Sequence, residues 1–145
     1  MDLENIRAII SDNNIETVIV AGTDPAGILR GKRFSRDSFL RSAVHGVHLA
    51  SFILYTTTVD DPVPWLFDTG IPDCTGIPDL STFRVAPWEE AAAICLVDWY
   101  QDGVPSVYCP RSELKRQVTR VREHGWVEQF AMEVEFFLID QDIRV

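Results

Sequence analysis

Two glutamates near the end of the sequence have the spacing of a paired-carboxylate metal site. Glu133 and Glu135 alternate with apolar residues in the segment AMEVEFFL, residues 131–138. Because side chains alternate between the two faces of a β-strand, both carboxylates would project from one face, with their Cα atoms roughly 6.5–7 Å apart. Like charges held beside apolar residues repel each other and lose hydration, and a hard cation such as Mg²⁺ or Mn²⁺ relieves both costs. The pattern therefore predicts metal ligands.

The same pattern has a second interpretation, in which a strand with one solvated face happens to carry two glutamates. Two carboxylates do not complete the coordination shell of Mg²⁺, so further ligands would have to come from elsewhere. The spacing alone leaves both interpretations open.

The elements that would position these glutamates follow from hydrophobic periodicity and from turn residues. Apolar residues recur at helical spacing near both ends of the chain, and β-branched runs bounded by Gly, Pro and Asp indicate strands. We predict helices at residues 3–14, around 38–41 and at 110–124, and strands at 16–21, 28–34, 51–59, 83–85, 92–98, 104–108 and 130–139. Residues 60–79, rich in Pro, Gly and Asp, are predicted to form a long loop.

This order of elements predicts an α+β fold, because strands outnumber helices and do not alternate with them regularly. The segment Cys109-Pro110-Arg111 is the best internal boundary, since a proline there starts the clearest helix. We therefore predict one domain at residues 1–108 and a second unit at residues 109–145.

Composition limits the classes of partner. The formal net charge is −9, and an acidic chain repels nucleic-acid phosphates and anionic lipid, so we expect neither as a partner. No apolar run reaches membrane-spanning length, and the first ten residues lack the pattern of a signal peptide. Three cysteines without zinc-site spacing indicate reduced thiols. A cytoplasmic location is expected.

Four motifs, in order, resemble the glutamine synthetase family. Residues 23–32 (TDPAGILRGK) resemble its opening hairpin, and residues 77–84 (IPDLSTFR) resemble its PDLSTxR segment. Residues 109–116 (CPRSELKR) resemble its DPRxxLKR helix start, and residues 133–138 (EVEFFL) resemble its ExEFFL strand. The resemblance covers roughly residues 16–140.

This resemblance implies a β-grasp (ubiquitin-like) domain at residues 1–108, followed by the first helix and strand of an α+β catalytic domain at 109–145. It implies that Glu133 and Glu135 are metal ligands, one for each of two Mg²⁺ or Mn²⁺ ions. The implied reaction joins glutamate to ammonia or an organic amine, consumes ATP and passes through γ-glutamyl phosphate. The implied assembly is a ring-shaped homo-oligomer in which neighbouring subunits complete each active site.

Two departures from the family pattern refine this expectation. The family's remaining metal, ATP and glutamate ligands lie beyond Val145, so we expect the 145-residue chain alone to be inactive. Ala50, followed by Ser51, stands where ammonia-using members carry an aspartate that helps to bind ammonium. Both residues are amine-pocket candidates, and the lost carboxylate favours a γ-glutamyl-amine ligase acting on a polyamine, monoamine or aromatic amine.

Two alternatives to a ligase fragment remain. The chain could be a non-catalytic β-grasp module that associates with a full-length ligase, or a truncated product without a role. The alternating apolar residues of the last predicted strand would be left exposed in an isolated chain, so we expect it to self-associate or to be unstable.

Overall fold

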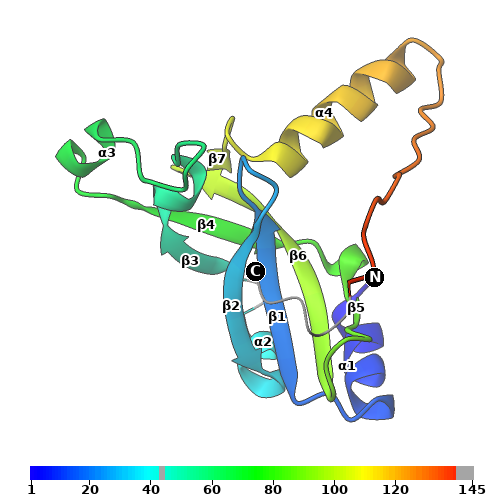
Figure 1. Ribbon diagram of the computed structural model, residues 1–145. Helices are drawn as coiled ribbons and strands as arrows, with labels where there is room; N and C mark the ends of the chain where they lie inside the picture. The colour runs from blue at the N-terminus through cyan, green and yellow to red at the C-terminus, as the bar shows by residue number, and fades with distance from the viewer. Residues whose placement is uncertain (43–44, 140–145) are drawn as a thin grey trace.

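A computed structural model describes residues 1–42 and 45–139 (Figure 1). Helices and strands mix in one seven-stranded sheet with helices packed beside it. The helices are α1 (Leu3–Asp12), α2 (Arg36–Ser42), α3 (Trp65–Asp68) and α4 (Pro110–Glu123), with 3₁₀ turns η1 (Ser51–Leu54) and η2 (Leu80–Thr82). The strands are β1 (Thr17–Thr23), β2 (Leu29–Ser35), β3 (Val47–Ala50), β4 (Asp73–Pro78), β5 (Arg84–Val85), β6 (Ala92–Gln101) and β7 (Val104–Pro105).

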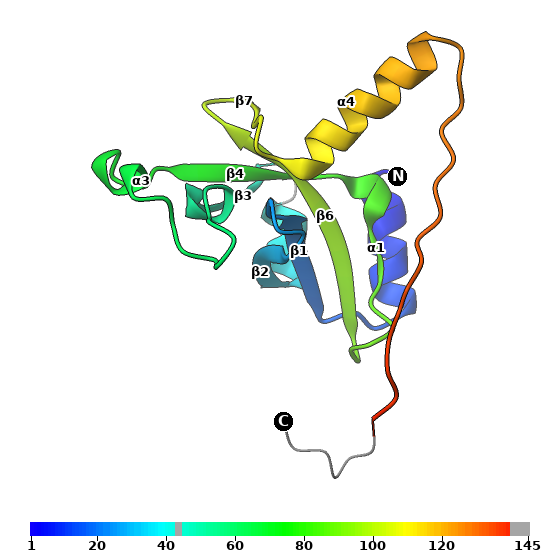
Figure 2. The ribbon, with the colours of Figure 1, turned by 45° about the horizontal axis from the view of Figure 1, so that its top comes forward.

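The long strand β6 joins two halves of the sheet, whose order is β2-β1-β6-β4-β3. The first half of β6 runs parallel to β1, with Thr17 opposite Ala92. Its second half pairs antiparallel with β4, with Gly76 opposite Trp99. Figure 2 shows β4 crossing β6 at a steep angle, so the sheet changes direction along this one strand.

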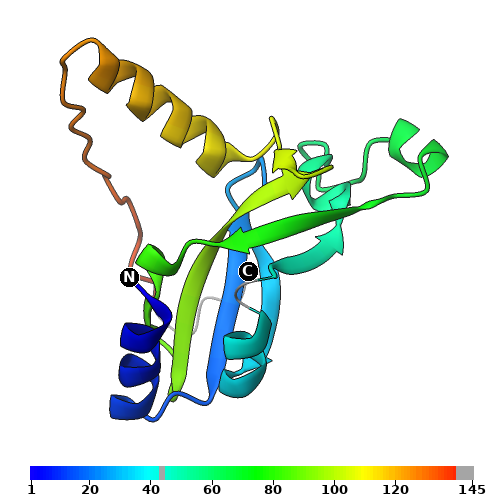
Figure 3. The ribbon, with the colours of Figure 1, turned by 180° about the vertical axis from the view of Figure 1, so that it is seen from behind.

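The core lies between the sheet and the first two helices. Alternate residues of β1 and β6 are fully buried and belong to one apolar cluster with residues of α1 and α2; these are Val18, Val20, Ala93, Cys95, Ile6, Ile10 and Phe39. The view from behind in Figure 3 shows α1 and α2 on the same side of these strands. Buried residues recur every second position in the strands and every fourth position in α1, as expected for a sheet face covered by helices.

Local side-chain bonds fix the first elements. Asp2 caps α1, because its carboxylate accepts a hydrogen bond of 2.8 Å from the backbone N–H of Asn5. Asp24 is fully buried in the β1–β2 turn, and its Oδ1 accepts bonds from the N–H groups of Ala26 and Ile28. Its Oδ2 accepts a bond of 2.9 Å from Arg30 Nε, so the buried carboxylate is fully bonded.

Trp99, which is fully buried, lies between two glycines on neighbouring strands. A Cβ atom on Gly22 would lie 2.6 Å from its Nε1, and one on Gly76 would lie 2.7 Å from its Cζ3. The indole N–H donates a 3.1 Å hydrogen bond to the carbonyl of Thr23. The two glycines thus make the space that this ring occupies where the sheet changes direction.

α4 extends away from the sheet, and residues 126–139 follow it as an extended segment without regular structure (Figure 1). None of the residues of α4 is buried. The apolar side chains that follow are largely exposed, including Met132 at 92% and Leu138 at 93%.

The structure confirms most predicted elements and corrects three. The mixed helix-and-sheet class, the opening helix and hairpin, the strand at 92–98 and the helix from Pro110 are confirmed. The predicted strand at 51–59 is wrong, because η1 buries the adjacent residues Ile53 and Leu54 together, which an alternating strand cannot do.

The predicted loop at 60–79 is also wrong in part, because it contains α3 and strand β4. The predicted strand at 130–139 is not formed. A strand needs a hydrogen-bonding neighbour, and within the described residues no segment pairs with it.

Candidate functional site

The glutamate pair lies in the extended segment after α4. Glu133 and Glu135 are both exposed, and their positions two apart in an extended chain let both carboxylates project to the same side. Within residues 1–42 and 45–139, no group of three or more His, Cys, Asp or Glu side chains is placed to hold a metal ion. The two carboxylates alone are hard oxygen donors, which could fill part of the coordination shell of Mg²⁺ or Mn²⁺.

The amine-pocket candidates lie at the other side of the sheet. Ala50 ends β3 and pairs with Asp73 of β4, and Ser51 begins η1. Ser51 is fully buried, and its backbone N–H donates to the carbonyl of Pro72 at 2.9 Å, but its hydroxyl oxygen has no hydrogen-bond partner among the described residues. Figures 1 and 2 place β3 and the segment after α4 on opposite sides of β6, so this chain does not bring the two candidate sets together.

A cluster of four charged residues, which was not predicted from the sequence, lies where α4 meets the sheet. Asp79 caps η2 and Asp98 lies on β6, while Arg111 and Lys115 lie one turn apart on α4. Arg111 donates to Asp98 Oδ1 and to Asp79 Oδ2, each at 2.6 Å. Lys115 Nζ lies 2.6 Å from Asp98 Oδ2 and 3.2 Å from Asp79 Oδ2. We call these four residues the charged junction.

The contacts of the charged junction favour the ionised forms of Asp79 and Arg111. Burial of Asp79 opposes ionisation, but hydrogen bonds from Ser81, Arg111 and Lys115 outweigh it and hold the pKa of Asp79 well below its usual range. Burial likewise opposes the charge of Arg111, and its bonds to Asp79 and Asp98 outweigh this and raise its pKa. The sequence signal was present in the PDLSTxR and PRxxLKR motifs, but nothing local showed that they meet.

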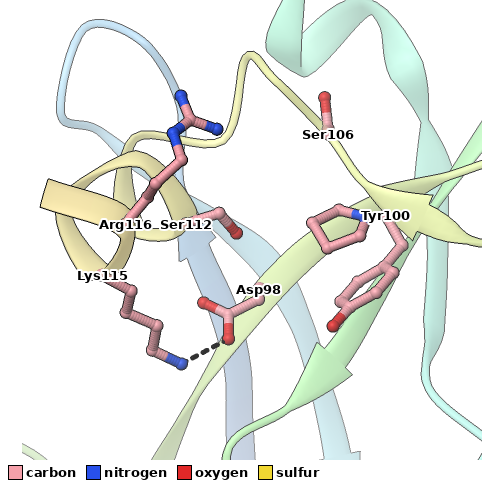
Figure 4. Close-up of a pocket in the computed structure, with 7 residues that line it drawn as sticks. Asp98, Tyr100, Ser106, Ser112, Lys115 and Arg116 are labelled. Carbon is pink, nitrogen blue, oxygen red and sulfur yellow. Dashed lines mark hydrogen bonds and ion pairs between the residues drawn. The ribbon is translucent and has the colours of Figure 1, made fainter. Parts of the chain in front are cut away.

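A cavity of about 350 Å³ lies beside the charged junction, between β6 and the start of α4. Figure 4 shows Lys115 reaching across it to Asp98, with Ser112 facing the same space. Its lining comprises Asp98, Tyr100, Pro105, Ser106, Ser112, Lys115 and Arg116. Lys115 already pairs with Asp98, and Arg116 pairs with Glu113 on its own helix, so neither cation is a free charge for a ligand.

Two of the three cysteines are poor nucleophiles. Cys74, Cys95 and Cys109 are all buried and free. Burial raises the pKa of Cys74 and of Cys95 to about 11, which keeps both thiols protonated near neutral pH. All three thiols belong to the apolar core cluster.

Comparison with known proteins identifies the family. A family model described as glutamine synthetase, catalytic domain, matches residues 107–144. Gamma-glutamylethanolamide synthetase of Streptomyces coelicolor is 33% identical over 144 residues, covering 95% of this chain and 31% of that protein. The chain belongs to the glutamine synthetase family.

A second relative supports the same assignment, and a solved structure shares the fold. A glutamate–isopropylamine ligase of a Pseudomonas species is 31% identical over 144 residues, with 95% of this chain and 31% of that protein covered. A solved structure of GmaS without ligand shares the fold, with a TM-score of 0.65 over 81% of this chain and 26% of that chain, at 24% identity. The chain thus spans about a third of the length of the curated relatives it matches. Among the described residues, no helix is long and apolar enough to cross a membrane.

Proposed function

We propose that this chain is the N-terminal part of an ATP-dependent ligase that joins glutamate to an organic amine through γ-glutamyl phosphate. The observation that carries the proposal is the match over 95% of the chain to two relatives, one named as a γ-glutamylethanolamide synthetase and the other as a glutamate–isopropylamine ligase. Ala50, in place of an aspartate that would attract ammonium, supports an organic amine over ammonia as the substrate.

In this proposal, residues 1–108 form the β-grasp domain and residues 109–145 begin the catalytic domain. Glu133 and Glu135 would each ligate one of two divalent cations. A cation bound there would neutralise phosphate charge during phosphoryl transfer. The remaining ligands come from sequence beyond this chain, and neighbouring subunits of a ring-shaped homo-oligomer complete the site. The free cysteines fit a cytoplasmic location.

The test begins with the coding sequence beyond Val145. If the frame continues, the complete product is assayed with ATP, glutamate, Mg²⁺ and a panel of amines: ammonia, ethanolamine, isopropylamine, putrescine and aniline. Mass spectrometry then detects the γ-glutamyl amide. We expect an organic amine to be preferred over ammonia, and Glu133→Gln and Glu135→Gln each to reduce turnover by at least about 100-fold, as loss of a metal ligand does.

Ala50 provides the specificity test. Ala50→Asp is expected to shift preference toward ammonia, while Ala50→Asn, which has nearly the same size without the charge, should not. Absence of any γ-glutamyl product from the complete protein, with every amine tested, would refute the ligase proposal.

A non-catalytic module is the second candidate, and one observation favours it. The buried core cluster runs from Ile6 to Cys109, so the folded unit is nearly confined to the proposed first domain. If a stop codon follows Val145, the module proposal predicts a cooperatively folding chain that co-purifies with a full-length ligase.

A further inference from the structure

α4 is held to the rest of the molecule with little apolar packing. None of its residues is buried, and Leu114 on its apolar stripe is 58% exposed. The residue just before it, Cys109, is 1% exposed, and its sulfur accepts a bond from the backbone N–H of Trp99 at 3.4 Å. Cys109 therefore fixes one end of the helix but leaves its direction undetermined.

The charged junction supplies the missing constraint. Its two acids belong to the folded unit: the Asp79 carboxylate is bonded to the N–H and hydroxyl of Ser81, and Asp98 lies opposite Ile77 in the β4–β6 ladder. Its two bases lie on one face of α4, four residues apart. Each base contacts both acids, so four contacts tie two points on the helix to two points on the sheet.

Two tied points and one buried end restrict both the tilt and the rotation of a helix. The side chains involved are mostly shielded from solvent, with exposed fractions of 19% for Arg111, 22% for Asp79 and 16% for Asp98. Lys115 is 49% exposed and closes the outer side of the cluster. Shielding weakens the screening of such charges by salt, so the geometry persists at physiological ionic strength.

We propose that Arg111 and Lys115 are positioning residues that set the direction of α4, and with it the path of the chain that carries Glu133 and Glu135, relative to the sheet. Their relevance to catalysis rests on the proposed ligase function, but their effect on the direction of α4 does not. Because partly exposed ion pairs contribute little to global stability, their loss should free the helix without unfolding the sheet.

The test measures the distance between the helix and the sheet in the 145-residue chain. Spin labels are attached at Lys32→Cys on β2 and Arg120→Cys on α4, both exposed positions, while the native cysteines stay protected by burial. The labelled chain is diluted into an excess of unlabelled chain, so that distances between associated copies do not contribute. Pulsed electron paramagnetic resonance should then give one narrow distance distribution for this labelled parent. Arg111→Met with Lys115→Met is expected to broaden it at least twofold, with the far-UV circular dichroism of the sheet unchanged.

Arg116→Met is the control, because among the described residues Arg116 pairs with Glu113 on the same helix, and its loss removes the same single charge from α4 as Lys115→Met alone. It should leave the distribution narrow. Lys115→Arg should also keep it narrow, since a guanidinium can span the same two acids.

An unchanged distribution in the double variant, or equal broadening in Arg116→Met, overturns the proposal. If the double variant does not fold, Lys115→Met alone is measured, since that residue is half exposed, and a narrow distribution there overturns the proposal too. The measurement uses no substrate, so its failure is distinguishable from failure of the ligase assay.

Discussion

The space between Gly22 and Gly76 that the ring of Trp99 occupies, here called the Trp99 slot, allows a quantitative test of packing in the sheet. Alanine at position 22 would place a Cβ atom 2.6 Å from Nε1 and 2.8 Å from Cε2 of the indole, and 2.9 Å from Cγ2 of Val97. The ring cannot withdraw freely, because it is fully buried and its N–H is bonded to the Thr23 carbonyl. Gly22 has no positive φ, so the backbone itself accepts alanine.

The expected cost follows from these contacts. Overpacking of a buried site costs about 1–3 kcal/mol, and weakening of the indole hydrogen bond adds about 1 kcal/mol. Replacing glycine also lowers the conformational entropy of the unfolded chain, which stabilises the folded state by about 0.5–1 kcal/mol. We therefore expect Gly22→Ala to lower the free energy of unfolding by about 2 kcal/mol.

The assay is urea unfolding followed by far-UV circular dichroism, in a double-mutant cycle with Trp99→Phe. Phenylalanine removes Nε1 and Cε2, the atoms nearest the new methyl group, so the double variant should be at least about 1 kcal/mol more stable than additivity predicts. Gly103→Ala is the control. Gly103 has a φ of 79° and open space around it, so its cost is purely conformational and should not couple to Trp99.

Additive effects at positions 22 and 99 would show that the indole does not compete with the methyl group. Coupling of equal size at Gly103 would show that the cycle reports a general loss of packing. Either result would refute the assignment of Gly22 to the Trp99 slot.

Three further predictions concern thiols, acid and association. Cys74 and Cys95, with pKa values raised to about 11 by burial, should react with iodoacetamide at pH 8 only at the rate of unfolding, as mass spectrometry can measure. Because the folded-state pKa of Asp79 is depressed, its stabilising effect is complete above about pH 4 and is lost as pH falls below that. The melting temperature of the parent chain should therefore fall more steeply on acidification than that of Asp79→Asn. Parallel plots of melting temperature against pH for the two chains would contradict this. The chain should self-associate in sedimentation velocity, and Phe136→Ser with Leu138→Ser should reduce this, because both side chains are largely exposed; a parent that stays monomeric at all concentrations would contradict it.

Elements with local signals were predictable from the sequence. Asp2 caps the first helix, the Asp24 turn closes the hairpin, and Pro110 begins α4. Each signal involves residues within a few positions of one another, so it acts wherever the segment lies in space.

Strand β4 was not predictable in the same way. Its sequence contains Gly76 and Pro78, which normally indicate a loop. Glycine is required at position 76 because the ring of Trp99 occupies the space that a side chain on residue 76 would need. Trp99 lies 23 positions further along the chain. Strand β4 therefore depends on a residue of β6 that the sequence near β4 does not reveal.

The same distinction applies to the candidate sites. The residue types of Glu133 and Glu135 predicted metal ligation, but among the described residues no group of three or more His, Cys, Asp or Glu side chains is placed to hold a metal ion. The charged junction escaped prediction because Asp79 and Arg111 are 32 positions apart and lie on separate elements that meet only in the folded chain.

The parallel pairing of β1 with β6 has a consequence for how the chain folds. Thr17 and Ala92 are partners although 75 residues separate them, whereas the β1–β2 hairpin joins Thr17 to Ser35. The hairpin can form as soon as it is synthesised, but at roughly 5–20 residues per second β6 emerges about 4–15 s after β1. Throughout that interval one edge of β1 stays open, and Val18 and Val20 lack their ladder partners Ala93 and Cys95, beside which they are later buried. A nascent chain at this stage presents an apolar hairpin edge of the kind that chaperones protect and that aggregation exploits.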